Sequence, residues 1–252
     1  MQLMINIFKL KSLISKPKVK IISAYDDRFS KIGKISEASI KNYANHFKFD
    51  HEIYKINRFK ERPPAWYKIK VLIENLKNDN YDYIIWVDSD AFFCRYENII
   101  DYIDKSKNLS LVFHNVLSQK KNKETYFNNI IYAPNTGFMV FKNCDWSRRF
   151  LELIWSQKKF INHPNWDNAA VYSILGYNSE IKKKNKNTFN KNFFDKIYKL
   201  PLIWNSIPSR DCFSPSNENI TLFEFNPVII HLAGMRKKNR KKFIKFFKKN
   251  FI

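Results

Sequence analysis

Glycine is scarce in this chain, with only 4 among 252 residues. P-loop and kinase-like proteins hold phosphates with glycine-rich loops, and the sequence contains no such segment. Cysteine is almost as rare. Cys94, Cys144 and Cys212 are odd in number, far apart and without C-x-x-C spacing, which argues against a disulfide framework and against a zinc site. The two shortages make phosphoryl transfer on a glycine-rich loop the weakest interpretation and favour a reducing compartment.

Long apolar runs are missing as well. No uncharged apolar stretch approaches the 18 residues that a membrane-spanning helix requires. The first residues, M-Q-L-M-I-N-I-F-K-L-K, lack the basic start and the small-residue cleavage site of a signal peptide. We therefore expect neither a transmembrane helix nor a signal peptide, and a cytoplasmic location.

Acidic residues are few, since 23 Asp and Glu stand against 45 Lys and Arg, giving a formal net charge of +22. A basic surface attracts polyanions. However, Lys, Asn, Ile and Phe are all abundant, and such a compositional bias explains most of the charge equally well. We expect no nucleic-acid partner.

The charge is densest at the end of the sequence, where residues 236–252 carry nine Lys or Arg and no acid. Four phenylalanines follow helical spacing there: Phe243, Phe246, Phe247 and Phe251. A basic helix with bulky apolar residues can lie on an anionic membrane. We interpret residues 237–252 as a basic amphipathic tail that holds the protein at the cytoplasmic face of a membrane. The alternative is a terminal helix that docks its phenylalanine face on the core.

The rest of the chain alternates strand-like and helix-like segments. Strands are expected over 18–24, 51–56, 84–87, 109–114, 136–142 and 228–231, and helices over 35–47, 65–77, 146–158 and 167–175. Hydrophobic residues make up 44% of the sequence, enough for a substantial core. The alternation predicts an α/β class. We divide the chain into a lead-in over 1–17, one domain over 18–236 with a polar loop over 181–192, and the tail over 237–252.

Two aspartates one residue apart follow a strand that reads as buried on both faces. Ile84 to Val87 are continuously apolar, and Asp88 and Asp90 come directly after them. Ligands of α/β sheets gather at the carboxyl ends of strands. A divalent cation there could join both carboxylates to a nucleotide diphosphate. The alternative is a pair of solvated aspartates in a turn.

Six motifs in a fixed order resemble glycosyltransferase family 34, the galactosyl-, mannosyl- and xylosyltransferases of GT-A fold. They are P-A-W-Y-K-I-K-V-L (64–72), I-I-W-V-D-S-D-A-F-F (84–93), L-V-F-H (111–114), N-T-G-F-M-V-F-K-N-C-D-W-S (135–147), W-D-N-A-A-V (166–171) and H-L-A-G-M-R (231–236). The resemblance spans residues 18–236. It implies one domain with a Rossmann-like mixed sheet flanked by helices.

The resemblance also implies a reaction. Members of the family transfer a sugar from a nucleotide diphosphate to a glycan hydroxyl, retaining the anomeric configuration and using Mn²⁺ at the D-x-D. We therefore predict a metal-dependent retaining enzyme that takes a UDP-sugar such as UDP-galactose, with Mg²⁺ as a possible substitute metal. The acceptor is predicted to be a glycan or a lipid-linked saccharide. His231, after an apolar run, resembles the family's third metal ligand beside Asp88 and Asp90.

The donor nucleotide is expected to contact residues around these ligands. Tyr25 and Asp26 follow the first strand, where an aromatic face and a carboxylate suit a uracil and a ribose, although a simple turn is the alternative. Gly234 would let the backbone approach the phosphates. Arg236 occupies the family position of the cation that pairs with the diphosphate. The remaining predicted donor contacts are Ser89 and Lys68, the latter equally well explained as a solvated helix lysine.

Asp167 and Asn168 correspond to an Asp-Gln pair of the family near the reacting face. Asp167 would orient the donor sugar or stabilise an oxocarbenium-like state, and its alternative is an acid at a helix N-terminus. The Gln is Asn here, which weakens any claim of a covalent nucleophile and favours front-face substitution assisted by the leaving phosphate. The acceptor side is predicted to be lined by Asn135, Thr136 and Gly137, with Trp66 or Trp166 as a sugar-stacking surface.

A second function of a different class remains open. A GT-A-like protein without activity could bind membranes or polyanions through its basic surface. Binding would then depend strongly on salt, and nucleotide affinity would not depend on metal. The intact Asp88, Asp90 and His231 favour the enzyme.

Overall fold

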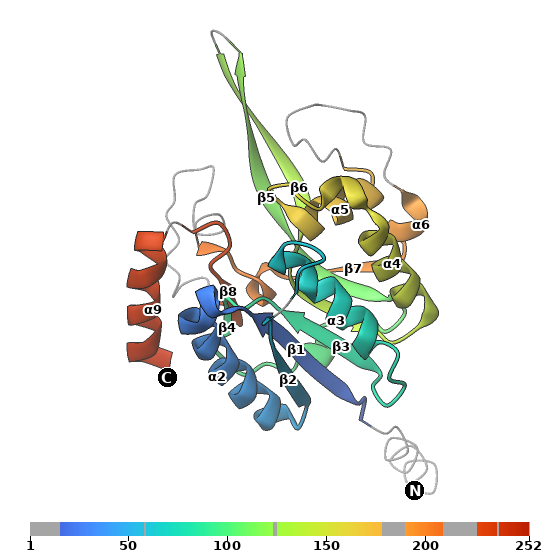
Figure 1. The fold of residues 1–252 in the computed structure, drawn as a ribbon, viewed down its shortest axis with the longest axis vertical. Helices are drawn as coiled ribbons and strands as arrows, with labels where there is room; N and C mark the ends of the chain where they lie inside the picture. The colour runs from blue at the N-terminus through green and yellow to red at the C-terminus, as the bar shows by residue number, and fades with distance from the viewer. Residues whose placement is uncertain are drawn as a thin grey trace, which may run out of the picture.

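The computed structural model describes residues 16–57, 59–122, 125–177, 190–208, 226–235 and 237–251. They form a single mixed α/β domain around a six-stranded sheet of order β2-β1-β3-β6-β5-β7 (Figure 1). Its strands are β1 (Val19–Tyr25), β2 (Asp50–Lys55), β3 (Tyr83–Val87), β5 (Leu109–Asn122), β6 (Thr125–Lys142) and β7 (Ile197–Leu200). β1 is parallel to β2 and β3, and β5 is parallel to β7, whereas β6 is antiparallel to its neighbours β3 and β5.

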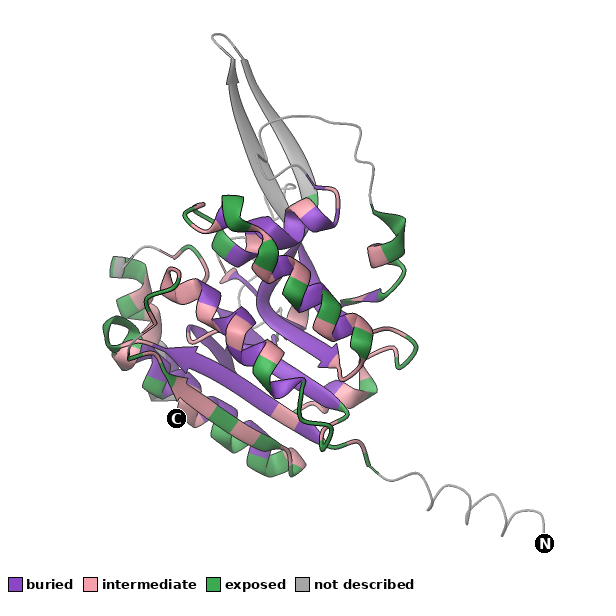
Figure 2. Cartoon of the chain, turned by 45° about the vertical axis from the view of Figure 1, so that its right-hand side comes forward, coloured by how far each residue is buried: buried purple, intermediate pink, exposed green. Residues whose placement is uncertain are grey.

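Helices cover both faces of this sheet. The described helices of the domain are α2 (Ser30–Phe47), α3 (Tyr67–Asn75), α4 (Asp145–Ser156), α5 (Trp166–Ile174), α6 (Lys191–Phe194) and α9 (Lys237–Phe251), with short 3₁₀ helices η1 (Asp27–Phe29), η2 (Pro64–Trp66), η3 (Ile99–Asp101), η4 (Lys158–Phe160) and η5 (Leu202–Trp204). α3, α4 and α5 lie on one face and α2 on the other (Figure 1). Buried residues fill the sheet and the inner sides of the helices (Figure 2).

The predicted α/β alternation is confirmed, with differences at the ends of elements. α2 begins five residues before the predicted helix, and β5 and β6 run beyond the predicted strands toward one another. β7 and the short β4 (Ala91–Phe93) were not predicted. Most of the predicted lead-in and most of the polar loop over 181–192 lie outside the described residues.

The central strand β3 is buried on both faces, as its continuous apolar run predicts. Ile84 and Trp86 pack with α3, α4 and α5, while Ile85 and Val87 point to the side of α2. Side chains alternate between faces along a strand, so an apolar residue is needed at every position. Each such side chain contributes about 1.5–3 kcal/mol through burial. β3 is therefore a rigid base for the residues that follow it.

The chain changes sheets at the D-x-D. β3 ends at Val87, and β4 pairs not with the main sheet but with β8 (Ile229–His231) in a separate two-stranded sheet. A turn makes the change, in which the Ala91 backbone N–H donates to the Asp88 carbonyl at 2.9 Å. The antiparallel register places Ala91 opposite His231. The pairing of two distant segments thus brings the last residue of β8 next to both aspartates.

Helix α9 packs on the domain. Phe247 is 1% exposed, and its ring centroid lies 4.9 Å from that of Phe92 in β4. Phe243 stacks on Phe247, and both join a cluster with residues of α2 and β8. For these two phenylalanines the structure shows docking on the core. Among the helix residues whose burial is described, the exposed lysines are Lys238, Lys241, Lys242 and Lys245. Among the described helices, none is long and apolar enough to cross a membrane.

Candidate metal and donor site

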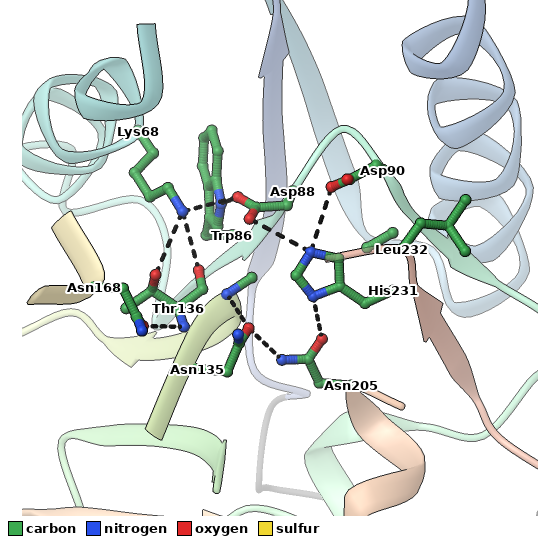
Figure 3. Close-up of polar contacts among 12 residues, drawn as sticks. Lys68, Trp86, Asp88, Asp90, Asn135, Thr136, Asn168, Asn205, His231 and Leu232 are labelled. Atoms are coloured by element: carbon green, nitrogen blue, oxygen red, sulfur yellow. Dashed lines mark hydrogen bonds and ion pairs between the residues drawn. The ribbon is translucent and has the colours of Figure 1, made fainter. Parts of the chain in front are cut away.

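Three potential metal ligands meet at the carboxyl end of β3. Asp88, Asp90 and His231 each offer one ligand atom, and these atoms lie within 4.8 Å of one another. The Nε2 atom of His231 is 3.3 Å from Asp90 Oδ1 and 3.7 Å from Asp88 Oδ2 (Figure 3). Two carboxylates and an imidazole suit Mn²⁺ and are also compatible with Mg²⁺. The structure therefore brings together the three residues predicted as ligands.

A bulge in β6 makes room for the histidine. The register between β5 and β6 shifts at this point, so that Leu111 pairs with Met139 but Val112 pairs with Asn135. Bulges of this kind re-aim side chains and are frequent beside active sites. Gly137 lies within the bulge, and a Cβ added to it would come 2.1 Å from His231 Cε1. Only glycine leaves space for the imidazole.

The second ring nitrogen of His231 has its own partner. Nδ1 lies 2.9 Å from Oδ1 of Asn205, whose Nδ2 donates to Oδ1 of Asn135 at 2.9 Å. The same Asn135 oxygen accepts the backbone N–H of Gly137 at 2.8 Å (Figure 3). Asn135 was predicted to line the acceptor side, whereas here its oxygen supports the histidine. Asn205 carried no signal in the sequence.

Lys68 is buried between two carboxylates. Its Nζ lies 2.9 Å from Asp88 Oδ1 and 3.2 Å from Asp167 Oδ2. Burial favours the neutral amine, but Asp167 and Asp88 outweigh it and raise the pKa of Lys68 above its ordinary value. The indole N–H of Trp86 also donates to Asp88 Oδ1, at 2.6 Å. Lys68 is therefore a charged residue of the site and not the solvated helix lysine of the alternative.

Asp167 and Asn168 are joined to the β6 bulge through Thr136. The Thr136 hydroxyl donates to Asp167 Oδ2 at 2.7 Å, and its backbone N–H donates to Asn168 Oδ1 at 3.0 Å. Because that N–H can only donate, the Nδ2 group of Asn168 points away from Thr136. Burial raises the pKa of Asp167 above its usual range, although Lys68 opposes the shift. Asp167 does lie in the first turn of α5, as the helix N-terminus alternative expects, but it is also buried and paired with Lys68 and Thr136.

A further cation comes from α9. Arg240 Nη2 lies 3.2 Å from Asp90 Oδ2 and 3.3 Å from the Leu232 carbonyl oxygen. Burial acts to raise the pKa of Asp90, but its close neighbours His231 and Arg240 hold that pKa below its ordinary value. Each aspartate of the D-x-D therefore has a cation beside it, Lys68 or Arg240. Arg236, predicted for the diphosphate, lies outside the described residues.

The predicted donor residues before α2 are occupied by local contacts. The ring of Tyr25 lies against Gly33, and a Cβ added to Gly33 would be 2.4 Å from Cγ of Tyr25. Lys55 Nζ lies 3.6 Å from the centroid of the Tyr25 ring. The hydroxyl of Tyr25 donates to Glu37 at 2.6 Å. The structure does not support Tyr25 as an open stacking surface. Asp26 caps η1 by accepting the Phe29 N–H at 3.1 Å, as the turn alternative expects.

Ser89 and Gly234 lie in the two turns that flank the metal ligands. Ser89 is partly exposed between the aspartates. Gly234 is exposed with φ +67°, and nothing lies within 4 Å of an added Cβ. The open space at Gly234 is compatible with the predicted close approach of a phosphate to the backbone.

Of the two tryptophans predicted to stack on a sugar, only one is accessible. Trp66 is completely buried and its indole N–H donates to the Ile161 carbonyl oxygen at 3.2 Å, so it is a core residue. Trp166 is 41% exposed, directly before Asp167, and has φ +37°. A left-handed backbone is strained for a bulky residue, and such strain is found at functional sites. Trp166 is the better candidate for an acceptor surface.

Comparisons with known proteins bear on the fold. Searches against family models and against curated proteins found no match. Among solved structures, a glycosyltransferase involved in the glycosylation of the major capsid of PBCV-1 is similar at 12% identity and TM-score 0.62, covering 91% of this chain and 100% of that one. The galactosyltransferase LgtC, in complex with donor and acceptor sugar analogs, gives 10% identity, TM-score 0.52 and coverages of 92% and 96%.

The glycosyltransferase GlyE of Streptococcus pneumoniae TIGR4 gives 12% identity and TM-score 0.51, covering 92% of this chain and 60% of that one. At such identities the likeness concerns the fold alone. Membership of glycosyltransferase family 34 stays a prediction. The six-stranded mixed sheet flanked by helices is the GT-A fold of these glycosyltransferases.

Proposed function

We propose that this protein transfers a sugar from a nucleotide-diphosphate sugar to a hydroxyl of a glycan or lipid-linked saccharide. The observation that carries the proposal is the group Asp88, Asp90 and His231, set at the carboxyl end of β3 within a GT-A fold. Ligands of α/β sheets bind at this edge. The similar proteins named above are glycosyltransferases, and one of them was solved with donor and acceptor sugar analogs.

The residues present fit a divalent cation. The acceptor atoms are hard oxygens and one imidazole nitrogen, and the ligand atoms are close enough to share one ion. Asp88, Asp90 and His231 would hold Mn²⁺, with Mg²⁺ as a substitute. When bound, the cation would neutralise negative charge on the departing diphosphate.

The protein's own cations add to this stabilisation. Lys68 and Arg240 lie beside the two aspartates at 2.9 and 3.2 Å. A guanidinium grips phosphate as a planar fork, and a buried ammonium acts as a point charge. We propose that Arg240 contacts the diphosphate; the contact that the resemblance implies for Arg236 lies outside the described residues.

We also propose that the reaction proceeds with retention by front-face substitution. A covalent route would require a carboxylate free to attack the sugar. Asp167 is 3% exposed, pairs with Lys68 and accepts a hydrogen bond from Thr136, which makes it a poor nucleophile. It serves better to orient the donor sugar, while the exposed indole of Trp166 would support the acceptor.

Thermal unfolding with UDP, GDP and CMP, each with and without Mn²⁺, tests the proposal. A ligand at about 100 times its dissociation constant should stabilise the folded protein by about 2.7 kcal/mol. We expect UDP to stabilise the protein only with metal, and Asp90→Ala to abolish the effect. Asp79→Ala, an exposed acid far from the site, is the matched control and should respond like the parent. If no nucleotide shifts the parent, the enzyme proposal is wrong and an inactive GT-A-like protein is favoured.

The basic helix carries a separate proposal about location. We propose that the exposed lysines of α9 bind an anionic membrane at its cytoplasmic face. Because Phe243 and Phe247 are packed on the core, the attraction would be electrostatic, at about 1 kcal/mol per lysine.

Replacing Lys238, Lys241, Lys242 and Lys245 together by Gln should weaken co-sedimentation with anionic vesicles by up to roughly 4 kcal/mol at low salt. The control removes the same charge elsewhere, at the exposed residues Lys77, Lys105, Lys158 and Lys159. Parent and control should both sediment with the vesicles and detach at high salt. Equal binding by the two quadruple variants would show that α9 is not the membrane contact.

A further inference from the structure

Four polar groups form a chain that ends on the metal-site histidine. They are the Gly137 backbone N–H, the Asn135 amide, the Asn205 amide and the His231 imidazole (Figure 3). We infer that Asn205 is a positioning residue that keeps a proton on His231 Nδ1, so that Nε2 is the nitrogen offered to the metal. The metal belongs to the proposed function, whereas the position of the proton does not depend on it.

The direction of every hydrogen bond follows from the first group. A backbone N–H can only donate, so the Asn135 atom 2.8 Å from Gly137 N must be the amide oxygen. That oxygen also receives a bond from Asn205 at 2.9 Å, so the Asn205 atom facing it must be the NH₂ group. The other end of the Asn205 amide is then its oxygen, and this oxygen lies 2.9 Å from His231 Nδ1.

An amide oxygen is only an acceptor, so Nδ1 must carry a proton. This holds whether the ring is neutral or doubly protonated. In the neutral ring Nε2 has no proton, and its lone pair points toward Asp90 and Asp88, at 3.3 and 3.7 Å. A backbone group in β6 thus determines the tautomer of a residue in β8.

The chain of bonds has little freedom to reverse. Asn205 is completely buried and His231 is 3% exposed, so an inverted Asn205 amide would set its oxygen against the Asn135 oxygen, leaving two buried acceptors without a donor between them. The backbone next to Asn205 is also held, because the Ser206 N–H donates to the Ile229 carbonyl at 2.9 Å and the Ser206 carbonyl accepts the His231 backbone N–H at 2.7 Å. Residues that hydrogen-bond the second ring nitrogen in this way commonly set the orientation and tautomer of metal-binding histidines.

The tautomer is measured directly by nitrogen-15 NMR on metal-free protein labelled at histidine, with His231→Gln to assign the signal. At a pH where the ring is neutral, we expect the Nδ1–H form in the parent. Asn205→Ala should abolish that preference. Asn135→Asp should keep it, because a carboxylate still accepts from both Gly137 and Asn205. An Nε2–H ring in the parent overturns the inference, whatever the metal or donor experiments give.

Metal affinity provides the second readout, from electron paramagnetic resonance of unbound Mn²⁺. We expect Asn205→Ala to weaken Mn²⁺ binding about 10- to 100-fold. Asn75→Ala is the matched control, because Asn75 is a buried amide with two hydrogen bonds far from the site. If both variants lose affinity equally, Asn205 acts on stability alone and the inference fails. If the parent binds no Mn²⁺ but shows the Nδ1–H ring, the proposed function fails and the tautomer assignment stands.

Discussion

Lys68→Met is expected to destabilise the folded protein by about 3–5 kcal/mol, the usual cost of removing one partner of a buried ion pair. The loss is large because Lys68 serves two carboxylates, Asp88 and Asp167, and Asp167 is itself buried. Methionine replaces the packing of the stem but leaves both charges without their cation. Chemical denaturation at neutral pH, with the slope checked for two-state behaviour, measures the effect.

The pH dependence identifies the cause. Burial already raises the folded-state pKa of Asp167, so this group binds its proton more tightly in the folded protein than in the unfolded chain. The contribution of Asp167 to the stability of the folded protein therefore falls as the pH rises from the pKa of the group in the unfolded chain to its pKa in the folded protein. Removing Lys68 raises the folded pKa further. The loss of stability caused by Lys68→Met should therefore become smaller as the pH falls through the folded-state pKa of Asp167. Adding Asp167→Asn to the Lys68→Met variant should recover part of the lost stability.

Lys70→Met is the control, two residues further along α3. Lys70 pairs with Glu61 at 2.7 Å, but both side chains are well exposed, so its loss should cost at most about 1 kcal/mol. Equal losses at the two positions would contradict the role assigned to Lys68.

Gly137→Ala is expected to abolish metal binding while leaving a destabilised but folded protein. The new Cβ would lie 2.1 Å from His231 Cε1, 2.5 Å from Nδ1 and 2.9 Å from Asn135 Oδ1. Such overlap forces the imidazole out of place, and overpacking of a core costs typically about 1–3 kcal/mol. A Mn²⁺ titration should show an affinity at least about 100-fold below that of the parent, more than the loss of Asn205 alone.

Gly33→Ala is the control that separates the loss of stability from the loss of metal binding. Its added Cβ would overlap the Tyr25 ring at 2.4 Å, which is comparable crowding away from the metal ligands. A similar loss of stability with normal Mn²⁺ affinity is expected. Should Gly33→Ala lose metal affinity as well, the effect of Gly137→Ala would reflect general destabilisation and not the position of His231.

Local patterns predicted the parts of the site that belong to one segment. The apolar run before Asp88 requires a strand buried on both faces, and the position of a carboxylate after such a strand follows from the sheet. Asp90 follows Asp88 through a single turn. His231 was found by its motif and by the apolar run before it. The prediction of the two aspartates needed only the order of residues along one element, whereas the role of His231 was implied by the resemblance to glycosyltransferase family 34.

Contacts between distant segments could not be predicted in this way. Asn205 and Arg240 reach the site because η5 docks on β8, and β8 and α9 dock on β4. The phenylalanine spacing offered docking of α9 on the core as an alternative, but nothing in the local sequence showed which residues the helix would meet. The exposure of individual side chains could not be predicted from the local sequence either. Trp66 and Tyr25 have aromatic rings that could stack on a ligand. In the structure, however, Trp66 faces the core and Tyr25 is covered by Gly33 and Lys55.

The distance along the chain between the site's two halves sets an order of events during synthesis. Ala91 pairs with His231, which is 140 residues later (231 − 91), and closing so long a loop precedes any gain from the contact. At about 5–20 residues per second, the ribosome takes roughly 7 to 28 seconds to travel from one to the other. Throughout that interval the two aspartates stand without their histidine and without Arg240. The nascent protein therefore cannot complete its cation site until His231 and Arg240 have been synthesised and have docked.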